Sequence, residues 1–395
     1  MRHPKKITAG LLAAALLLAG CTATTTEPLA IGTTAETTTT STTTTTTAST
    51  STDPDIDVDW SDLPTTEVTL TDDGLAITEA GTYVLTGSST GQITVDTDGY
   101  VRIVLDGVTI DSSDGAAIQI DNAEATVIEL ADGSTNTISD ASTRGDEEID
   151  GAIYSSDDLY ITGDGALDVT AAFADGIVGK DDLWILSGTI SVTSVDDGIR
   201  GKDSLNISGG TITVDAAGDA LKATNDTDLG AGQLNISGGD ITIASGDDAV
   251  KAEQQVWISG GSIEITETVE GIEAPVVVID DGEIALNASD DGINAAASDI
   301  VTSGLSVTIN GGDITIVMGA GDTDAIDSNG DLTINGGTLD ITAQSAFDYD
   351  GTGTLNGGTI TVNGEQVTVL ENQMMGGGGG AGGGGAGGGA GGGQP

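Results

Sequence analysis

The chain has 395 residues and a formal net charge of −53, because 63 acidic residues stand against only 10 Lys and Arg. The single Cys (Cys21) and the single His (His3) lie near the N-terminus, so the rest of the chain has no disulfide, thiol nucleophile, Ser-His-Asp triad or Cys/His zinc site. The charge also excludes ordinary nucleic-acid binding, since phosphate is repelled, and it favours hard cations as partners.

The N-terminal segment has the pattern of an export signal. Basic residues precede an apolar run from Ile7 to Leu18, which is shorter than the roughly 20 residues of a membrane-spanning helix. The run ends in Leu-Ala-Gly-Cys at Cys21, a bacterial lipobox. We therefore expect residues 1–20 to be a signal peptide, Cys21 to carry lipid, and the protein to be exported and anchored to the outer face of the cell membrane. The alternative is a plain secretory peptide with a chance Cys.

Two low-complexity segments flank the predicted folded domain. Residues 21–64 begin with the lipidated Cys and continue as a Thr-rich stalk, whose composition cannot bury a core. The stalk is either an acceptor of O-linked glycans or a plain spacer. Residues 371–395 form a Gly-rich flexible tail without a phosphate-binding pattern. The folded domain is therefore expected over residues 65–370.

An internal repeat organises residues 65–370. Segments that begin with Asp-Gly-Ile or a variant of it recur at residues 175, 197, 219, 248, 270, 291 and 324, a base period of about 22 with insertions. Each is followed by a second short strand with a Gly corner, such as LNISGG at 205–210, and then by a third alternating strand. Three short strands per period predict an all-β parallel β-helix, with Ile, Leu and Val inside and Thr, Asn, Asp and Lys outside. No window has the 3.6-residue period of a helical solenoid.

Stacking of these coils places the Asp residues that begin each segment in a row. Carboxylates one strand spacing apart repel, so the row needs a bound cation, raised pKa values or hydrogen bonds to backbone amides. Oxygen ligands in a flexible arrangement suit Ca²⁺, which we expect as the cofactor. The alternative is that Asp before Gly is turn chemistry alone. The candidate metal ligands are Asp175, Asp196, Asp197, Asp219, Asp247, Asp248, Asp290 and Asp291.

The few basic residues are concentrated beside this row. Five of the seven Lys and Arg that remain after residue 20 follow the Asp-Gly-Ile element in consecutive coils. The functional interpretation is an anion-binding groove, in which Ca²⁺ and the basic strip together hold the carboxylates of a polymer. The alternative is charge compensation of the neighbouring Asp residues. The members of the strip are Lys180, Arg200, Lys202, Lys222 and Lys251.

Aromatic side chains are rare and occupy equivalent sites. Trp184 and Trp257 stand at the outward position of the second strand of their coils, and Tyr160 holds the corresponding place one coil before Trp184. Flat aromatic rings on a sheet face can stack on sugar rings, so both Trp residues are candidate substrate-binding residues. The alternative is that they shield the sheet beneath the stalk or an insertion.

The early segments carry the more specific resemblance. With AGTYVLTG at 80–87 and VRIVLDGVTI at 101–110, the chain resembles the calcium-associated carbohydrate-binding β-helix family of bacterial surface lipoproteins, which is related in fold to pectate lyases but non-catalytic. The resemblance implies a right-handed parallel β-helix, bound Ca²⁺, and binding of plant cell-wall polysaccharides, notably polygalacturonate, with cellulose as a further candidate. The chain departs from the regular pattern at Glu270 and at Thr323-Asp324, which argues against a continuous row of metal ions there.

The leading functional hypothesis is a monomeric, non-catalytic surface protein that captures acidic polysaccharide through Ca²⁺ and the Lys/Arg strip. Two alternatives stay open. A Ca²⁺-dependent polysaccharide lyase would use a Lys or Arg of the strip as its base, although no single one stands out. A structural adhesin would use the surface without a dedicated sugar site.

Overall fold

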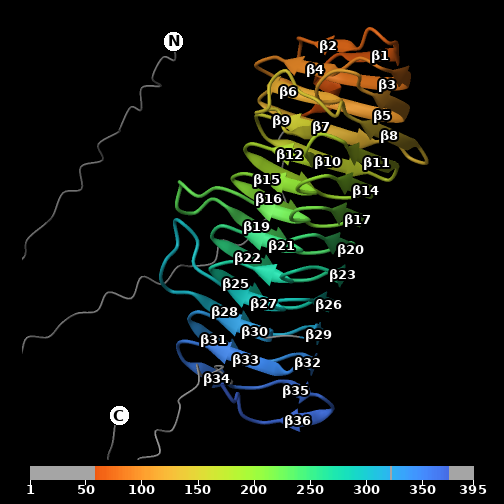
Figure 1. The fold of residues 1–395 in the computed structure, drawn as a ribbon. Coiled ribbons are helices and arrows are strands. Elements are labelled where there is room, and N and C mark those ends of the chain that lie inside the picture. Colours follow the sequence, from red (N-terminus) through yellow and green to blue (C-terminus); the bar gives the residue numbers. More distant parts are fainter. Residues whose placement is uncertain (1–57, 321–322, 373–395) are drawn as a thin grey trace, which may run out of the picture. The chain divides into compact units, whose positions relative to one another are not determined.

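The computed structural model describes residues 58–320 and 323–372, and these residues form the expected parallel β-helix (Figure 1). Successive coils stack one on the next, from β1 to β36. The expected signal peptide, the expected lipidation site at Cys21, most of the predicted stalk and the predicted tail from residue 373 lie outside the described residues. No helix in the described part of the chain is long and apolar enough to cross a membrane.

One coil illustrates how the repeat folds. β15 (Ile199–Gly201), β16 (Ser204–Ile207) and β17 (Thr211–Ala216) follow one another around the coil, and each pairs in parallel with its counterpart in the next coil. Ile199 pairs with Leu221, so residues 22 apart in the sequence become neighbours in space. The coil therefore has three faces, each a ladder of parallel strands.

Face 1 is a sheet of 12 strands that carries the Asp-Gly-Ile elements. Its strands are β2 (Leu75–Ile77), β4 (Ile93–Asp96), β6 (Ile118–Asn122), β9 (Gly151–Ser155), β12 (Asp175–Gly179), β15, β18 (Leu221–Ala223), β21 (Val250–Ala252), β24 (Ile272–Glu273), β27 (Ile293–Ala295), β30 (Asp324–Ser328) and β33 (Ser345–Tyr349).

Face 2 carries the second strand of each coil. Its strands are β7 (Ala125–Leu130), β10 (Leu159–Gly163), β13 (Asp182–Ile185), β16, β19 (Gln233–Ile236), β22 (Gln255–Ile258), β25 (Val276–Ile279), β28 (Ser306–Ile309), β31 (Asp331–Ile334) and β34 (Gly353–Leu355). Face 3 carries the third strand. Its strands are β8 (Thr135–Ser139), β11 (Ala166–Ala171), β14 (Thr189–Ser194), β17, β20 (Asp240–Ser245), β23 (Ser262–Glu267), β26 (Glu283–Ala288), β29 (Asp313–Met318), β32 (Thr338–Thr342) and β35 (Thr359–Val362).

The first coils join faces 2 and 3 into one sheet of 24 strands. β1 (Thr65–Leu70) pairs with β3 (Gly81–Ser89), and β3 pairs with β5 (Tyr100–Asp111). β5 is long enough to pair with β7 through its first half and with β8 through its second half. The 3-10 helix η1 (Trp60–Asp62) precedes β1, and the last strand, β36 (Glu365–Val367), turns back antiparallel to β35.

The core lies inside the coils and is built from columns of identical or similar side chains. Leu183, Leu205, Leu234 and Val256 follow one another in register on face 2, and each is fully buried. Burying one such side chain contributes about 1.5–3 kcal/mol. Because the side chains of a strand alternate in direction, the residues between these core positions all point outward, where they can form rows along the stack.

Candidate functional site

The Asp residues that begin successive coils form a hydrogen-bonded ladder along the edge of face 1. The N–H of Asp197 donates to Asp175 Oδ1 at 3.0 Å, and the N–H of Asp219 donates to Asp197 Oδ1 at 3.0 Å. The N–H of Asp248 donates to Asp219 Oδ1 at 2.8 Å. All four side chains are buried. Hydrogen bonding to backbone amides, as the turn-chemistry alternative predicts, therefore satisfies one carboxylate oxygen on each of Asp175, Asp197 and Asp219.

Arg200 and Lys222 neutralise the remaining oxygens of this ladder. Arg200 Nε donates to Asp175 Oδ2 at 2.7 Å. Lys222 Nζ lies 3.0 Å from Asp197 Oδ2 and 2.7 Å from Asp219 Oδ2. Burial alone would lower the pKa of Lys222, but Asp219 and Asp197 hold that pKa above its usual value.

Lys251 is the last basic residue of this row. Its ammonium contacts the carboxylate of Asp248 and lies 3.3 Å from Glu273 Oε1. Arg200, Lys222 and Lys251 are in direct register on β15, β18 and β21. These three cations compensate the charge of the Asp ladder, so the row is not a free basic ridge.

Lys180 and Lys202 differ from the other members of the strip. Both follow the last residue of a face 1 strand, at the corner that leads to face 2. Their nearest carboxylate oxygens, on Asp150 and Asp203, are 3.8 and 4.0 Å away. Their side chains are 32% and 44% exposed, against 14% for Arg200. Lys202 is therefore the most exposed of the five predicted cations, whereas Lys180 is only slightly more exposed than Lys251, at 27%.

The Asp doublets separate into two roles. The first members, Asp196, Asp247 and Asp290, are exposed and lie outside the ladder, although Asp247 approaches Asp219 and Asp248 closely enough to share a cation. The second members belong to the ladder. Asp291 repeats the pattern further along, because the N–H of Asp324 donates to Asp291 Oδ1 at 3.0 Å.

Beside Lys202, the corner between faces 1 and 2 gathers carboxylates that are absent from the predicted metal ligands. Oxygens of Asp158, Asp181 and Asp182 all lie within 4.8 Å of one another. Together with Asp203 we call these residues the corner cluster. Burial, followed by the charges of Asp158 and Asp203, raises the pKa of Asp181 to about 6. The corner thus holds more negative charge than its lysines neutralise.

Neighbouring side chains orient the corner cluster. The hydroxyl of Ser204 donates to Asp182 Oδ1 at 2.6 Å, and Asn206 Nδ2 donates to the Ser204 hydroxyl at 2.5 Å. Asn225 Nδ2 donates to Asp203 Oδ1 at 2.6 Å. Asn225 belongs to the insertion at residues 224–232, which follows β18 and therefore bounds the cluster on its C-terminal side.

A signal for this cluster does exist in the sequence. Asp181 follows Gly179-Lys180, and Asp203 follows Gly201-Lys202, in two successive coils. The repeated Gly-Lys-Asp would have placed carboxylates in register at the same corner.

Aromatic rings adjoin the corner cluster on face 2. Trp184 and Asp182 both point outward from β13. The rings of Tyr160 and Trp184 are stacked, with centroids 6.5 Å apart and planes at 11°. Burial, together with the charges of Asp158 and Asp182, raises the pKa of the buried Tyr160 to about 12, so its hydroxyl stays protonated. Trp184 remains partly exposed.

Trp257 lies apart from this group. Asn206 and Asn235 stand between Trp184 and Trp257 in the outward row of face 2. Trp257 Nε1 donates to Asp280 Oδ2 at 2.8 Å, which ties its ring to the following coil. The two Trp residues share a face, but only Trp184 belongs to the corner.

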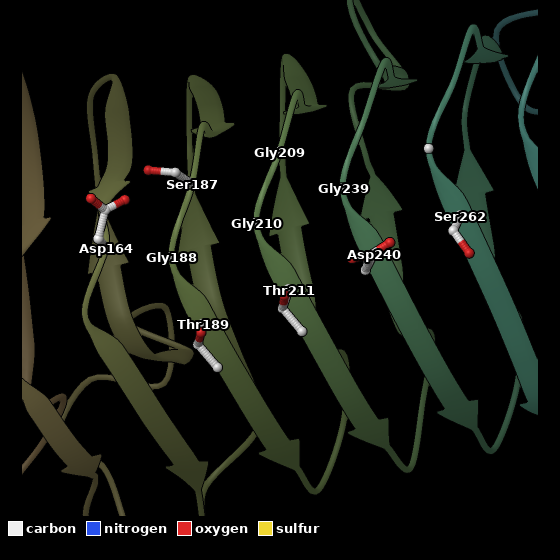
Figure 2. A pocket seen from close by; sticks show the side chains of 11 residues that line it. Asp164, Ser187, Gly188, Thr189, Gly209, Gly210, Thr211, Gly239, Asp240 and Ser262 are labelled. Atoms are coloured by element: carbon white, nitrogen blue, oxygen red, sulfur yellow. The ribbon is translucent and has the colours of Figure 1, made fainter. Parts of the chain in front are cut away.

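A shallow groove of about 660 Å³ follows a different corner, between faces 2 and 3 (Figure 2). Glycines of successive coils line it, and the side chains of Asp164 and Asp240 lie beside them (Figure 2). Most of these glycines are the second of a Gly-Gly pair, as in Gly209-Gly210. The second glycine of each pair has a left-handed backbone, as at Gly239 with φ of 99°, which only Gly adopts without strain. No Lys, Arg or aromatic residue is among those that line it, so the predicted substrate-binding residues lie elsewhere.

The chain is similar to a protein of known structure and matches a protein-family model. A solved structure described as the polysaccharide lyase-like protein from C. thermocellum, as a gadolinium derivative, is 27% identical and covers 72% of this chain and 98% of that chain, with a TM-score of 0.49. No curated protein matches the chain. A family model for carbohydrate-binding domain-containing proteins matches residues 71–274 and 269–374, nearly the whole of the β-helix. The chain therefore belongs to the family of carbohydrate-binding domain-containing proteins.

Proposed function

We propose that the protein captures acidic polysaccharide, such as polygalacturonate, at the corner between faces 1 and 2, through Ca²⁺ held by the corner cluster and through Lys180 and Lys202. One observation carries the proposal. Unneutralised carboxylates, the accessible ammonium of Lys202 and a partly exposed Trp184 lie together at this corner. The ammonium of Lys180 extends from the same corner over face 1, where it lies 3.8 Å from Asp150 Oδ2 and 5.8 Å from the centre of the Tyr154 ring.

The donor set of the corner cluster fits Ca²⁺. Asp158, Asp181 and Asp182 supply carboxylate oxygens within reach of one ion, and Ca²⁺ accepts six to eight oxygen ligands in flexible geometry. Three side chains leave coordination positions for water or for the carboxylate of a uronate. Calcium would supply charge neutralisation and a bridge between protein and polymer.

The lysines and Trp184 complement that bridge. Lys180 and Lys202 are held loosely, so their ammonium groups can pair with further sugar carboxylates at little cost. Trp184 can stack on the apolar face of a sugar ring. Repeated carboxylates along the polymer would meet two lysines in neighbouring coils, which favours an extended acidic chain over a single sugar.

Export and anchoring belong to the same proposal. The lipobox at Cys21 supports attachment to the outer face of the cell membrane, and a Thr-rich stalk supports presentation of the β-helix away from it. A surface position is where a polysaccharide-capturing protein would meet an insoluble polymer.

The test is charge reversal at the two accessible lysines. The double variant Lys180→Glu, Lys202→Glu should lose roughly tenfold or more in affinity for polygalacturonate, measured by affinity electrophoresis with Ca²⁺ present. The matched control Lys180→Arg, Lys202→Arg keeps the charge and should keep the binding. Retention of polygalacturonate by the charge-reversed protein, with an unchanged thermal midpoint, would refute the proposed site.

A second candidate function rests on the position of the same lysines. A lysine beside a Ca²⁺ site is the arrangement in which a polysaccharide lyase abstracts the proton next to a uronate carboxylate. Such a lyase would release unsaturated sugars that absorb ultraviolet light. If unsaturated sugars appear when the protein is incubated with polygalacturonate and Ca²⁺, the protein is a lyase. Binding of polygalacturonate without release of unsaturated sugars supports capture.

A further inference from the structure

An insertion occupies the corner between faces 1 and 2 directly after the corner cluster. In the preceding coil only Lys202 and Asp203 connect β15 to β16, whereas residues 224–232 connect β18 to β19. The insertion begins on the preceding corner, because the N–H of Asn225 donates to the carbonyl oxygen of Lys202 at 2.9 Å. It also returns there, because the N–H of Gly232 donates to the carbonyl oxygen of Asp203 at 2.6 Å. The extra residues therefore stand next to Lys202 along the row of corners.

Buried side chains hold this first insertion in place while its middle projects from the stack. Asn225 Oδ1 accepts the N–H of Asp228 at 2.9 Å. Gln254 Nε2 donates to the carbonyl oxygen of Asp228 at 2.7 Å, and Gln254 Oε1 accepts the N–H of Gly230 at 2.9 Å. Both Asn225 and Gln254 are buried, whereas Leu229 is 78% exposed. The insertion is thus a wall supported from inside the corner.

A second insertion continues the wall along the same corner. Residues 296–305 connect β27 to β28, and the two insertions project from the same side of the stack (Figure 1). The hydroxyl of Ser298 donates to the carbonyl oxygen of Glu253 at 2.6 Å. Glu253 precedes Gln254, which supports the first insertion, so one corner links the two insertions. We call this continuous surface the ridge; it consists of residues 224–232, 253–254 and 296–305.

The ridge is acidic and contains no Lys or Arg. Its acids are Asp226, Asp228, Glu253 and Asp299. Burial raises the pKa of Glu253 against the opposing charge of Lys251, and the charges of Asp226 and Asp299 add to the increase. A polyuronate that followed the corner beyond the corner cluster would meet both a projecting chain segment and like charges. Both oppose its passage.

We propose that the ridge closes the C-terminal end of the corner site, so that the protein binds the ends of acidic polysaccharide chains and not their interior. The inference rests on the proposed function, since it concerns the polymer held by Lys202 and the corner cluster. A chain can enter the site from the N-terminal coils, because only Lys180 and Asp181 connect β12 to β13 there. Its last uronate then stops against the first insertion.

Binding stoichiometry distinguishes the end of a chain from its interior. The full-length protein is titrated with oligogalacturonates of several defined lengths by isothermal titration calorimetry, with Ca²⁺ present. The two ends of a polysaccharide chain differ chemically, so a site closed on one side accepts one of them. We therefore expect one protein molecule per chain at every length, including chains long enough to hold several molecules side by side.

Charge reversal on the first insertion is a second test. Asp226→Lys, Asp228→Lys changes two exposed side chains and sets ammonium groups beside the last uronate, so the affinity should rise roughly tenfold. The matched control is Glu147→Lys, Glu148→Lys, which makes the same change at exposed residues between β8 and β9, at another corner. At about 0.15 M salt, charges more than about 8 Å apart are largely screened, so the control should raise the affinity by less than about twofold.

Two outcomes would overturn the inference while leaving capture of the polymer intact. One is a number of bound wild-type molecules per chain that rises in proportion to chain length. The other is an equal gain in affinity from the two charge-reversed variants, since the ridge would then act only through the net charge of the protein. If the wild type binds no oligogalacturonate of any length, the proposed function itself is refuted, and the inference with it.

Discussion

At the scale of single residues, the Asp ladder shows how a strongly acidic surface is made compatible with close stacking. Asp219 is 2% exposed, accepts the N–H of Asp248 at 2.8 Å and lies 2.7 Å from Lys222 Nζ. Asp175, Asp197 and Asp219 thus each combine a backbone hydrogen bond with an ion pair. The repulsion between neighbouring coils is offset by cations set in register with the acids.

We predict that Asp219→Ala destabilises the protein, because it leaves the N–H of Asp248 without its acceptor and removes one partner of Lys222. The expected loss is about 1–3 kcal/mol in the free energy of unfolding, measured by chemical denaturation. Asp196→Ala removes the same type of residue from an exposed position and should change stability by less than about 0.5 kcal/mol. Equal effects of the two substitutions would contradict the role given to the ladder.

At the scale of elements, the Gly corners between faces 2 and 3 set how tightly coils can stack. The second glycine of each pair has a positive φ, 97° at Gly210 and 99° at Gly239. The first glycine lies close to the backbone of the previous coil, so that a Cβ on Gly209 would be 2.6 Å from the carbonyl oxygen of Leu186. A positive φ at one position and close backbone contact at the other both favour glycine. Because these residues have no side chain, a shallow groove lies along this corner (Figure 2).

A single methyl group at this corner should therefore be costly. Gly239→Ala forces a side chain into a left-handed conformation and is expected to cost about 1–2 kcal/mol in the free energy of unfolding. Gly145→Ala is the matched control, because Gly145 has an ordinary φ and open space around its Cβ position. A neutral Gly239→Ala in thermal melts would show that the corner backbone can relax.

At the scale of the whole β-helix, charge is distributed unevenly along face 1. The coils up to Lys251 carry Lys and Arg beside their acids, and later coils carry acids alone. Burial, followed by the charges of Asp291 and Asp348, raises the pKa of Asp327 to about 7. Burial also raises the pKa of Asp291 to about 6, while the hydrogen bond from Asp324 opposes the increase.

This asymmetry predicts an unusual pH dependence. Asp has a pKa of about 3.9 in an unfolded chain, so between about pH 4 and pH 7 the folded protein binds more protons than the unfolded chain does. The stabilisation that comes from proton binding to Asp291 and Asp327 is present at about pH 4. It is lost as the pH rises through the folded-state pKa values of these residues, about 6 and about 7. The thermal midpoint of metal-free protein should therefore fall from pH 4 to pH 7, and saturating Ca²⁺ should flatten that decline. A midpoint that rises over this range without metal would contradict the assignment.

The sequence by itself determined the coil. A period of about 22 residues with one apolar column per strand predicts the parallel stack, and it correctly places Leu205 over Leu234 and Arg200 beside Lys222. Register follows directly from such a repeat, because slipping by one residue would turn every core side chain outward. The sequence also indicated that acids and cations lie on one face.

Only the tertiary structure decided which of those groups are already satisfied. It pairs Lys222 with the Asp ladder and leaves Lys202 accessible, and it brings Asp158 and Asp181 together across a corner. Periodicity gives neighbours along a row, but contacts across a corner depend on the path of the chain through the turn and on how far each side chain is buried. Ion pairing and metal binding are governed by those distances and that burial, which the repeat alone does not specify.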